Sequence, residues 1–161
     1  MDFDARLQRA IERGEKAKEV RGRVAEAEKL TIEELKALHS TYRLEMTEHV
    51  EDTLKKLADH LPGFEYQSVY SEDGWGARLV RDELYLEPGS KAETHYSRLE
   101  VLVTPFSPSG IIEVTVKGTV RNREMLNRKH YQRLAEVDLN AFKELIDQRI
   151  LEFAEVYTAS R

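Results

Sequence analysis

The spacing of apolar residues changes from helical to strand-like near Pro62 and Gly63, and it returns to helical after Asp138. From Ile32 to Leu61, large apolar residues recur every three or four positions, which is typical of one buried face of a helix. The region between the two helical segments instead alternates apolar and polar residues. The strands form one block between helices, and helices and strands do not alternate along the chain. This order of elements predicts an α+β fold. The strand alternation is clearest at Ile112, Val114, Val116, Gly118 and Val120.

Three turn-forming sequences divide the central region into strands. They are Glu72-Asp73-Gly74, residues 87–93, and the proline- and serine-rich segment 105–110. Short connections favour antiparallel pairing of successive strands, so we predict an antiparallel meander of about five strands with one polar face. One C-terminal helix, starting at Leu139, should pack on the other face because its apolar side is broad. The first four strands are predicted at 64–70, 75–86, 95–104 and 111–120.

The segment 121–137 fits either a helix or a fifth strand. As a helix it would join the last helix into one element that is long for a domain of this size. As a strand, with Asn127 and Arg128 as the turn, it places Val120 opposite Ala135 and keeps apolar residues on one side of the sheet. We therefore predict a hairpin whose basic tip projects from the core.

Capping sequences mark the start of two of the helices. Thr31 and Glu34 have the spacing of a capping box, and Leu30 and Leu35 occupy the positions of a hydrophobic staple. Asp138 is the predicted N-cap of the last helix. The first of these boundaries separates the N-terminal segment of the chain from the helix that follows it.

Residues 1–30 contain eight basic and seven acidic side chains, yet their pattern indicates a helix. Acidic residues precede basic ones by four positions at three places, an arrangement that stabilises helices. The apolar seam of this helix is narrow, and Gly14 and Gly22 weaken it further. We predict a charged helical arm over 1–30 that needs a partner, and a single α+β domain over 31–161. The seam comprises Phe3, Leu7, Ile11, Ala17, Val20, Val24 and Ala27.

Composition excludes several classes of protein. The chain has 161 residues, enough for one ordinary core, and the second half is too apolar for disorder. The lack of cysteine excludes disulfides and thiol catalysis, and it gives no sign of an oxidising compartment. No apolar run in the sequence is long enough to span a membrane, so we expect a cytoplasmic protein with no membrane partner. A net charge of -5 argues against nonspecific coating of nucleic acid.

The sequence contains no motif for catalysis or cofactor binding. It has neither a Gly-x-Ser-x-Gly elbow nor a glycine-rich phosphate loop. Asp82 and Glu83 are adjacent, so a strand would point them to opposite faces. Glu45 and His49 have the spacing of helical metal ligands, but a companion motif is missing, so a charged helix edge explains them better. We therefore expect no catalytic residue, no cofactor and no metal, and an enzyme is the less favoured class.

Residues 117–133 are basic in an otherwise acidic chain and include a single acid, Glu124. A projecting basic ribbon can bind phosphates, and His130 and Tyr131 would supply stacking surfaces for bases. The simpler interpretation is a solvated hairpin that pairs with acidic groups of a neighbouring element or subunit. The candidate residues for an anion- or partner-binding site are Arg121, Arg123, Arg128, Lys129 and Arg133.

Aromatic residues suggest a further kind of site, a small-ligand pocket between the sheet and the helices. Aromatic side chains with polar groups commonly line ligand sites, although they also build ordinary cores. The residues concerned are Phe64, Tyr66, Tyr70, Trp75, Tyr85, Tyr96 and Tyr131.

These observations support three functional hypotheses. The leading one is a non-enzymatic interaction or assembly protein that forms a homo-oligomer through residues 1–30, with a different protein partner as a further option. The first alternative is binding of a nucleic acid, a less favoured partner, or of another anionic partner through the basic hairpin 117–133. The second alternative is a small-ligand or enzymatic site between the sheet and the helices.

Overall fold

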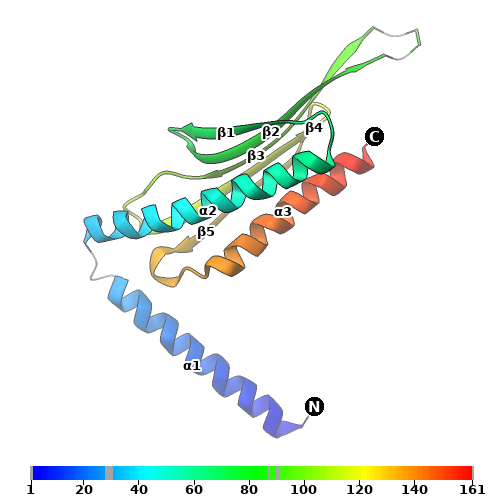
Figure 1. Cartoon of the computed structure of the whole chain (residues 1–161). Coiled ribbons are helices and arrows are strands. Elements are labelled where there is room, and N and C mark those ends of the chain that lie inside the picture. Colours follow the sequence, from blue (N-terminus) through cyan, green and yellow to red (C-terminus); the bar gives the residue numbers. More distant parts are fainter. Residues whose placement is uncertain (1, 28–30, 87, 90, 161) are drawn as a thin grey trace.

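The computed structural model describes residues 2–27, 31–86, 88–89 and 91–160, and it is an α+β fold as predicted. Two helices, α2 and α3, cover one face of a five-stranded sheet, while α1 extends away from them (Figure 1). The elements in chain order are α1 (Phe3–Ala27), α2 (Ile32–His60), β1 (Glu65–Ser71), β2 (Gly74–Tyr85), β3 (Glu93–Val103), β4 (Ile111–Val120), β5 (Arg123–Arg133), the short 3₁₀ helix η1 (Leu134–Glu136) and α3 (Leu139–Ala159).

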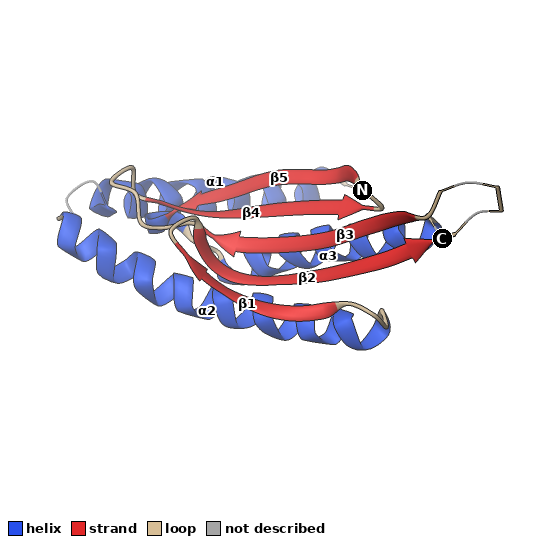
Figure 2. Cartoon of the chain, turned by 90° about the horizontal axis from the view of Figure 1, so that it is seen from above, coloured by secondary structure: helices blue, strands red, loops and turns tan. Residues whose placement is uncertain are grey.

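The sheet is an antiparallel meander with strand order β1-β2-β3-β4-β5, which confirms the predicted topology. The core lies between the sheet and the two helices, with α2 over β2 and α3 over β4. Figure 2 shows the strands in front of the helices, so the other face of the sheet is not covered by any described helix. The centre of that face is polar, because Arg78, Glu100 and Lys117 lie side by side on β2, β3 and β4.

Both predicted helix caps are present. The Thr31 side-chain oxygen accepts a hydrogen bond from the Glu34 amide at 3.2 Å, and the Asp138 carboxylate accepts one from the Ala141 amide at 3.1 Å. The staple that involves Leu30 lies outside the described residues. These caps satisfy amides that the first turn of a helix leaves without partners, so they set where α2 and α3 begin.

The residues 121–137 include a strand, but the predicted turn at Asn127 and Arg128 is wrong. The chain reverses at Arg121 and Asn122, so Val120 pairs with Arg123 and not with Ala135. As a result β5 pairs with β4 along its whole length, and the basic segment does not project as a tip.

The turn residues themselves explain this register. Arg121 and Asn122 have positive φ angles of 47° and 72°, the conformation of a two-residue hairpin turn, which asparagine tolerates well. The Asn122 side chain also accepts a hydrogen bond from the Tyr96 amide at 2.8 Å and donates one to the Thr94 carbonyl at 3.2 Å. Contacts to β3 therefore fix the turn, and the pattern of apolar residues in the two paired strands carries no information on these contacts.

Helix α1 has η1 as its principal contact within the described structure. Figure 1 shows α1 below the layer formed by α2 and α3, pointing away from the sheet. None of the described helices is both long enough and apolar enough to cross a membrane.

Candidate functional site

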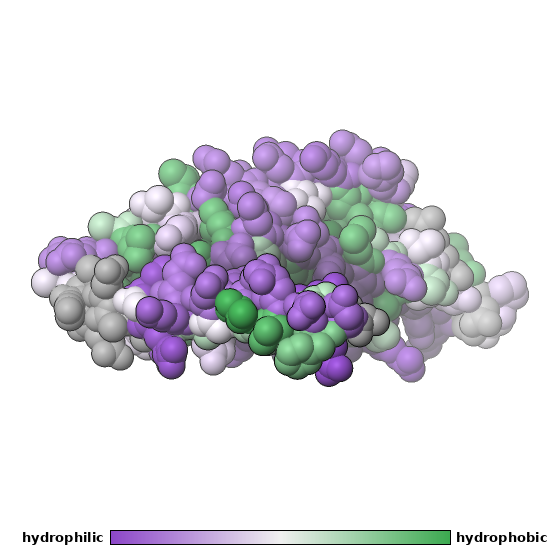
Figure 3. Space-filling view, turned by 90° about the horizontal axis from the view of Figure 1, so that it is seen from below, coloured by the Kyte–Doolittle hydropathy of each residue, from purple (hydrophilic) through white to green (hydrophobic). Residues whose placement is uncertain are grey.

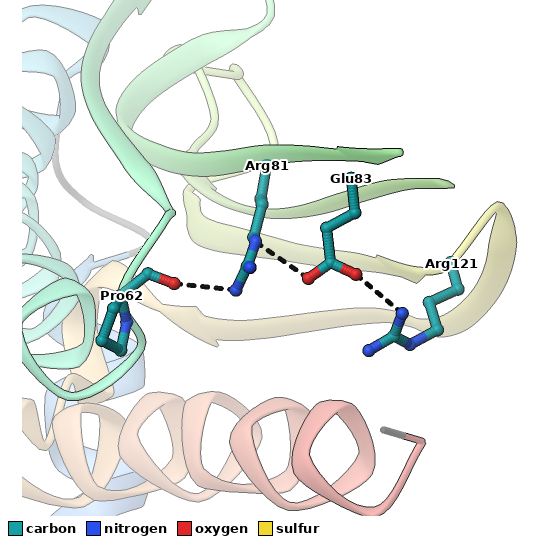
Figure 4. A pocket seen from close by; sticks show the side chains of 4 residues that line it. All are labelled: Pro62, Arg81, Glu83 and Arg121. Atoms are coloured by element: carbon teal, nitrogen blue, oxygen red, sulfur yellow. Dashed lines mark hydrogen bonds and ion pairs between the residues drawn. The ribbon is translucent and has the colours of Figure 1, made fainter. Parts of the chain in front are cut away.

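A polar pocket of about 370 Å³ lies at one end of the core and is lined by Pro62, Arg81, Glu83 and Arg121. Pro62 follows α2, Arg81 and Glu83 are on β2, and Arg121 is in the turn between β4 and β5. Arg81 and Glu83 are two positions apart, so both side chains point to the helix side of the sheet. Figure 4 shows the two guanidinium groups on opposite sides of the Glu83 carboxylate.

Glu83 is the centre of this cluster. One of its carboxylate oxygens lies 2.8 Å from Arg81 Nε, and the other accepts a hydrogen bond from Arg121 Nη1 at 2.7 Å. The Tyr157 hydroxyl of α3 donates a further hydrogen bond to Glu83 Oε1 at 2.7 Å. This hydrogen bond and the charges of the two arginines hold the pKa of Glu83 below its ordinary value, although partial burial opposes the shift. Both oxygens are engaged, so the carboxylate is poorly suited to act as a general base.

The two arginines also connect the carboxyl ends of both helices to the sheet. Arg81 Nη1 donates to the Pro62 carbonyl at 2.7 Å, just beyond α2. Arg121 Nε donates to Ser160 Oγ at 3.3 Å, at the end of α3. The carboxyl end of a helix carries partial negative charge, which favours a cation there and disfavours an anionic ligand. The arrangement is therefore best suited to holding the ends of α2 and α3 against β2.

We predict that Glu83→Gln destabilises the protein at neutral pH by about 1 kcal/mol, because a charge-assisted hydrogen bond is stronger than a neutral one and partial exposure weakens the ion pairs. Since the pKa of Glu83 is lowered in the folded state, its contribution is fully present above the pKa of the unfolded chain, and it is lost as the pH falls from that value through the lower pKa of the folded state. Urea unfolding of both proteins between neutral pH and pH about 3 measures the difference.

The stability difference between the wild-type protein and Glu83→Gln should shrink as the pH is lowered. Asp82→Asn is the matched control, because Asp82 is exposed on the opposite face of the same strand. A difference for Glu83→Gln that is the same at every pH would show that the ionised carboxylate does not contribute.

The five candidate basic residues do not form one surface. Arg121 belongs to the cluster described above, and the other four are exposed along β5. Arg128 pairs with a core residue of β4 and so lies on the helix side of the sheet, whereas Lys129 and Arg133 lie on the uncovered side. Arg123 lies at the start of the strand. The structure therefore divides these side chains between two faces of an edge strand.

Strand β5 is an edge of the sheet, which gives its basic residues a simpler explanation. Unpaired edges tend to recruit other strands, and natural proteins oppose this with charged side chains and bulges. Besides its charges, β5 has a register shift opposite Gly118 and Thr119. On its helix side, His130 accepts a hydrogen bond from Arg149 Nε at 3.1 Å, and burial together with the nearby arginines lowers the pKa of His130.

The structure does not bring together a metal site at the histidine and carboxylates of α2. His49 Nε2 lies 2.7 Å from the Asp147 carboxylate of α3, so it connects the two helices. Among residues 2–27, 31–86, 88–89 and 91–160, no group of three or more side chains has the arrangement of a metal site.

The seven aromatic residues do not line one pocket. Phe64 is buried in the core, where its ring contacts Tyr157 at a centroid distance of 4.9 Å. Tyr70 and Trp75 form an exposed pair at the far end of the first hairpin, with the Arg43 guanidinium 3.8 Å from the centre of the Trp75 ring. Tyr131 is exposed on the uncovered face of the sheet. These aromatic side chains therefore lie in separate parts of the described structure and do not converge on one site.

Within the described structure, α1 and the hairpin of β2 and β3 are two of the places where large apolar side chains are exposed. On α1, the exposed fractions are 73% for Phe3, 45% for Leu7 and 46% for Ile11. Figure 3 shows apolar residues gathered along this helix in the view from below. The second surface is the hairpin of β2 and β3, where Leu84 and Leu86 are exposed by 67% and 69%. The sequence indicated the first surface, but the exposure of the second depends on where the neighbouring strands end.

No protein-family model, curated protein or solved structure significantly matches this chain. Its function must therefore be inferred from its own surfaces.

Proposed function

We propose that this chain is a non-enzymatic, cytoplasmic assembly protein that self-associates through α1. The observation that carries the proposal is the exposed seam of Phe3, Leu7 and Ile11 on a helix that extends from the domain. The core is formed by residues of α2, α3, η1, the sheet and the loops between them, with no described side chain from α1. Helix α1 is therefore free to bind elsewhere without opening the core.

Solvation energy favours a partner for this helix. Full burial of a large apolar side chain stabilises a complex by about 1.5–3 kcal/mol relative to exposure in water. Three such side chains are each at least 45% exposed, so their burial in a complex would contribute substantially to the free energy of association. Most helices in proteins depend on packing of an apolar face for their stability, so a partner would also stabilise α1 itself.

Charge supports a second copy of the chain as the partner. Between Phe3 and Ala27 the sequence contains seven basic and five acidic residues, whereas the whole chain has a net charge of -5. The remainder of the molecule is consequently acidic and attracts the basic α1 of another copy. The lack of cysteine supports the cytoplasmic assignment, since intracellular proteins rarely depend on disulfides.

The test is sedimentation velocity of the full chain over a range of concentrations. We expect the wild-type protein to associate at tens of micromolar and the double variant Leu7→Ser/Ile11→Ser to be monomeric at the same concentrations. The loss of two half-exposed apolar contacts should raise the dissociation constant by at least about tenfold.

Leu151→Ser is the control for general changes in surface hydrophobicity, because Leu151 is 66% exposed on α3 and lies outside the proposed interface. It should associate like the wild-type protein. A wild-type chain that is monomeric throughout this range would refute the proposed function.

A further inference from the structure

The hairpin of β2 and β3 extends beyond the rest of the sheet. These strands pair with each other as far as Tyr85 and Glu93. In contrast, β1 pairs with β2 only as far as Val80, and the β3–β4 ladder ends at Arg98. We call the distal residues of this hairpin, Leu84–Leu86 and Glu93–His95, the hairpin arm. Figure 1 shows it projecting past the ends of the other strands.

The hairpin arm exposes three consecutive large apolar residues. Leu84 is 67% exposed, Tyr85 is 46% exposed and Leu86 is 69% exposed. The Tyr85 ring stacks on the His95 ring with centroids 5.0 Å apart, so the arm has an ordered aromatic face. A hairpin of only two strands is marginally stable in water, and apolar residues at its surface are typical of an interaction site. The hairpin arm is therefore a second surface that a partner would stabilise.

The net charges of α1 and of the hairpin arm are opposite in sign. Near the hairpin arm, the exposed acidic residues Asp82 and Glu93 outnumber the exposed basic residue Lys91. Helix α1 is net basic, with seven basic and five acidic residues between Phe3 and Ala27. Opposite charges at the rim of an apolar contact favour the correct pairing of two surfaces and speed their encounter.

We infer that α1 of one copy binds the hairpin arm of a second copy. This inference rests on the proposed function and identifies the surface that receives α1. Figure 1 places α1 and the hairpin arm on opposite sides of the helix layer, so the contact forms between copies. Two copies that exchange their α1 helices would form this contact twice, whereas a chain of copies would form it once between each pair of neighbours.

Binding of α1 to the hairpin arm and pairing of α1 with α1 lead to different results for two variants. The variant Leu84→Ser/Leu86→Ser keeps α1 intact, and Leu7→Ser/Ile11→Ser keeps the hairpin arm intact. Each variant alone should have a dissociation constant at least about tenfold above that of the wild-type protein. A mixture of the two should form a heterodimer, because α1 of the first variant can bind the hairpin arm of the second.

The experiment is sedimentation velocity of the two full-length variants, separately and mixed, with one of them fluorescently labelled. Circular dichroism and urea unfolding establish that both are folded, which we expect because all four substituted residues are at least 45% exposed. Leu44→Ser is the matched control, since Leu44 is 58% exposed on α2 and lies outside both surfaces.

A hairpin-arm variant that associates as the wild-type protein does, while the α1 variant is monomeric, would overturn this inference and leave the proposed function standing. Failure of the two variants to form a heterodimer would also overturn it and favour pairing of α1 with α1. Binding of the wild-type chain to phosphatidylcholine vesicles that depends on Leu84 and Leu86, with self-association unchanged, would assign the hairpin arm to a membrane surface instead. A monomeric wild-type chain would refute both proposals together.

Discussion

Gly76→Ala should lower the free energy of unfolding by about 3 kcal/mol, at the upper end of the cost of overpacking, because the added methyl group collides with backbone atoms. A Cβ atom at this position would lie 2.0 Å from the Val101 carbonyl oxygen and 3.0 Å from the Val101 carbonyl carbon. Val101 is on β3, in the centre of the sheet, and its backbone cannot withdraw without disturbing the pairing with β2. Equilibrium unfolding in urea measures the effect.

Gly22→Ala is the matched control for this substitution. Gly22 is in the interior of α1, and a Cβ atom there would have no neighbour within 4 Å. Alanine is favoured over glycine in a helix by up to about 1 kcal/mol, so this variant should be as stable as the wild-type protein or slightly more stable. Equal unfolding midpoints for Gly76→Ala and the wild-type protein would contradict the strand packing described here.

Phe153→Ala should destabilise the protein by about 3–5 kcal/mol, the usual cost of removing a buried phenylalanine ring. The ring is 1% exposed and contacts the rings of Phe64 and Tyr157, both at centroid distances of 6.2 Å. It also packs on Gly118 of β4, where a Cβ atom would lie 2.9 Å from Phe153 Cδ2. The absence of a side chain at Gly118 makes room for the ring, so a cavity would remain after its removal.

Urea unfolding again provides the measurement, and Leu151→Ala provides the control. Leu151 is two residues away on α3 and is 66% exposed, so its truncation should change the stability by less than about 0.5 kcal/mol. Similar losses for the two variants would show that α3 does not bury the face that contains Phe153.

The helices and most of the sheet were predictable from the sequence because local patterns determine them. The capping residues Thr31 and Asp138 mark helix starts that the structure confirms. The alternation from Ile111 to Val120 identifies a strand with one buried face, and that strand is β4. In each case the information lies within a few residues of the element concerned.

The turn between β4 and β5 was not predictable from the same patterns. On the helix side of β5, Leu126 is the only buried residue, so apolar pairing gives little information on the register. The register instead depends on the hydrogen bonds of Asn122 to Thr94 and Tyr96, residues of β3 that are more than twenty positions away.

The Glu83 cluster was missed for a similar reason. The adjacent positions of Asp82 and Glu83 predict opposite faces of a strand, which the structure confirms, but they indicate no partner for Glu83. Its partners Arg121 and Tyr157 are 38 and 74 positions away, and no motif connects them. Charged residues two positions apart on the helix side of a predicted strand, such as Arg81 and Glu83, are the signal that could have indicated an ion-pair cluster.

Self-association through α1 is tested most directly by amide hydrogen exchange of this helix at tens of micromolar protein and after about a hundredfold dilution, because exchange reports the local opening of each element. We expect the amides between Phe3 and Ala27 to be protected in the concentrated sample and to lose this protection on dilution, while the core strands stay protected in both. Leu7→Ser/Ile11→Ser should lack the protection at either concentration. Exchange of α1 that is independent of protein concentration would contradict the claim that this helix serves self-association.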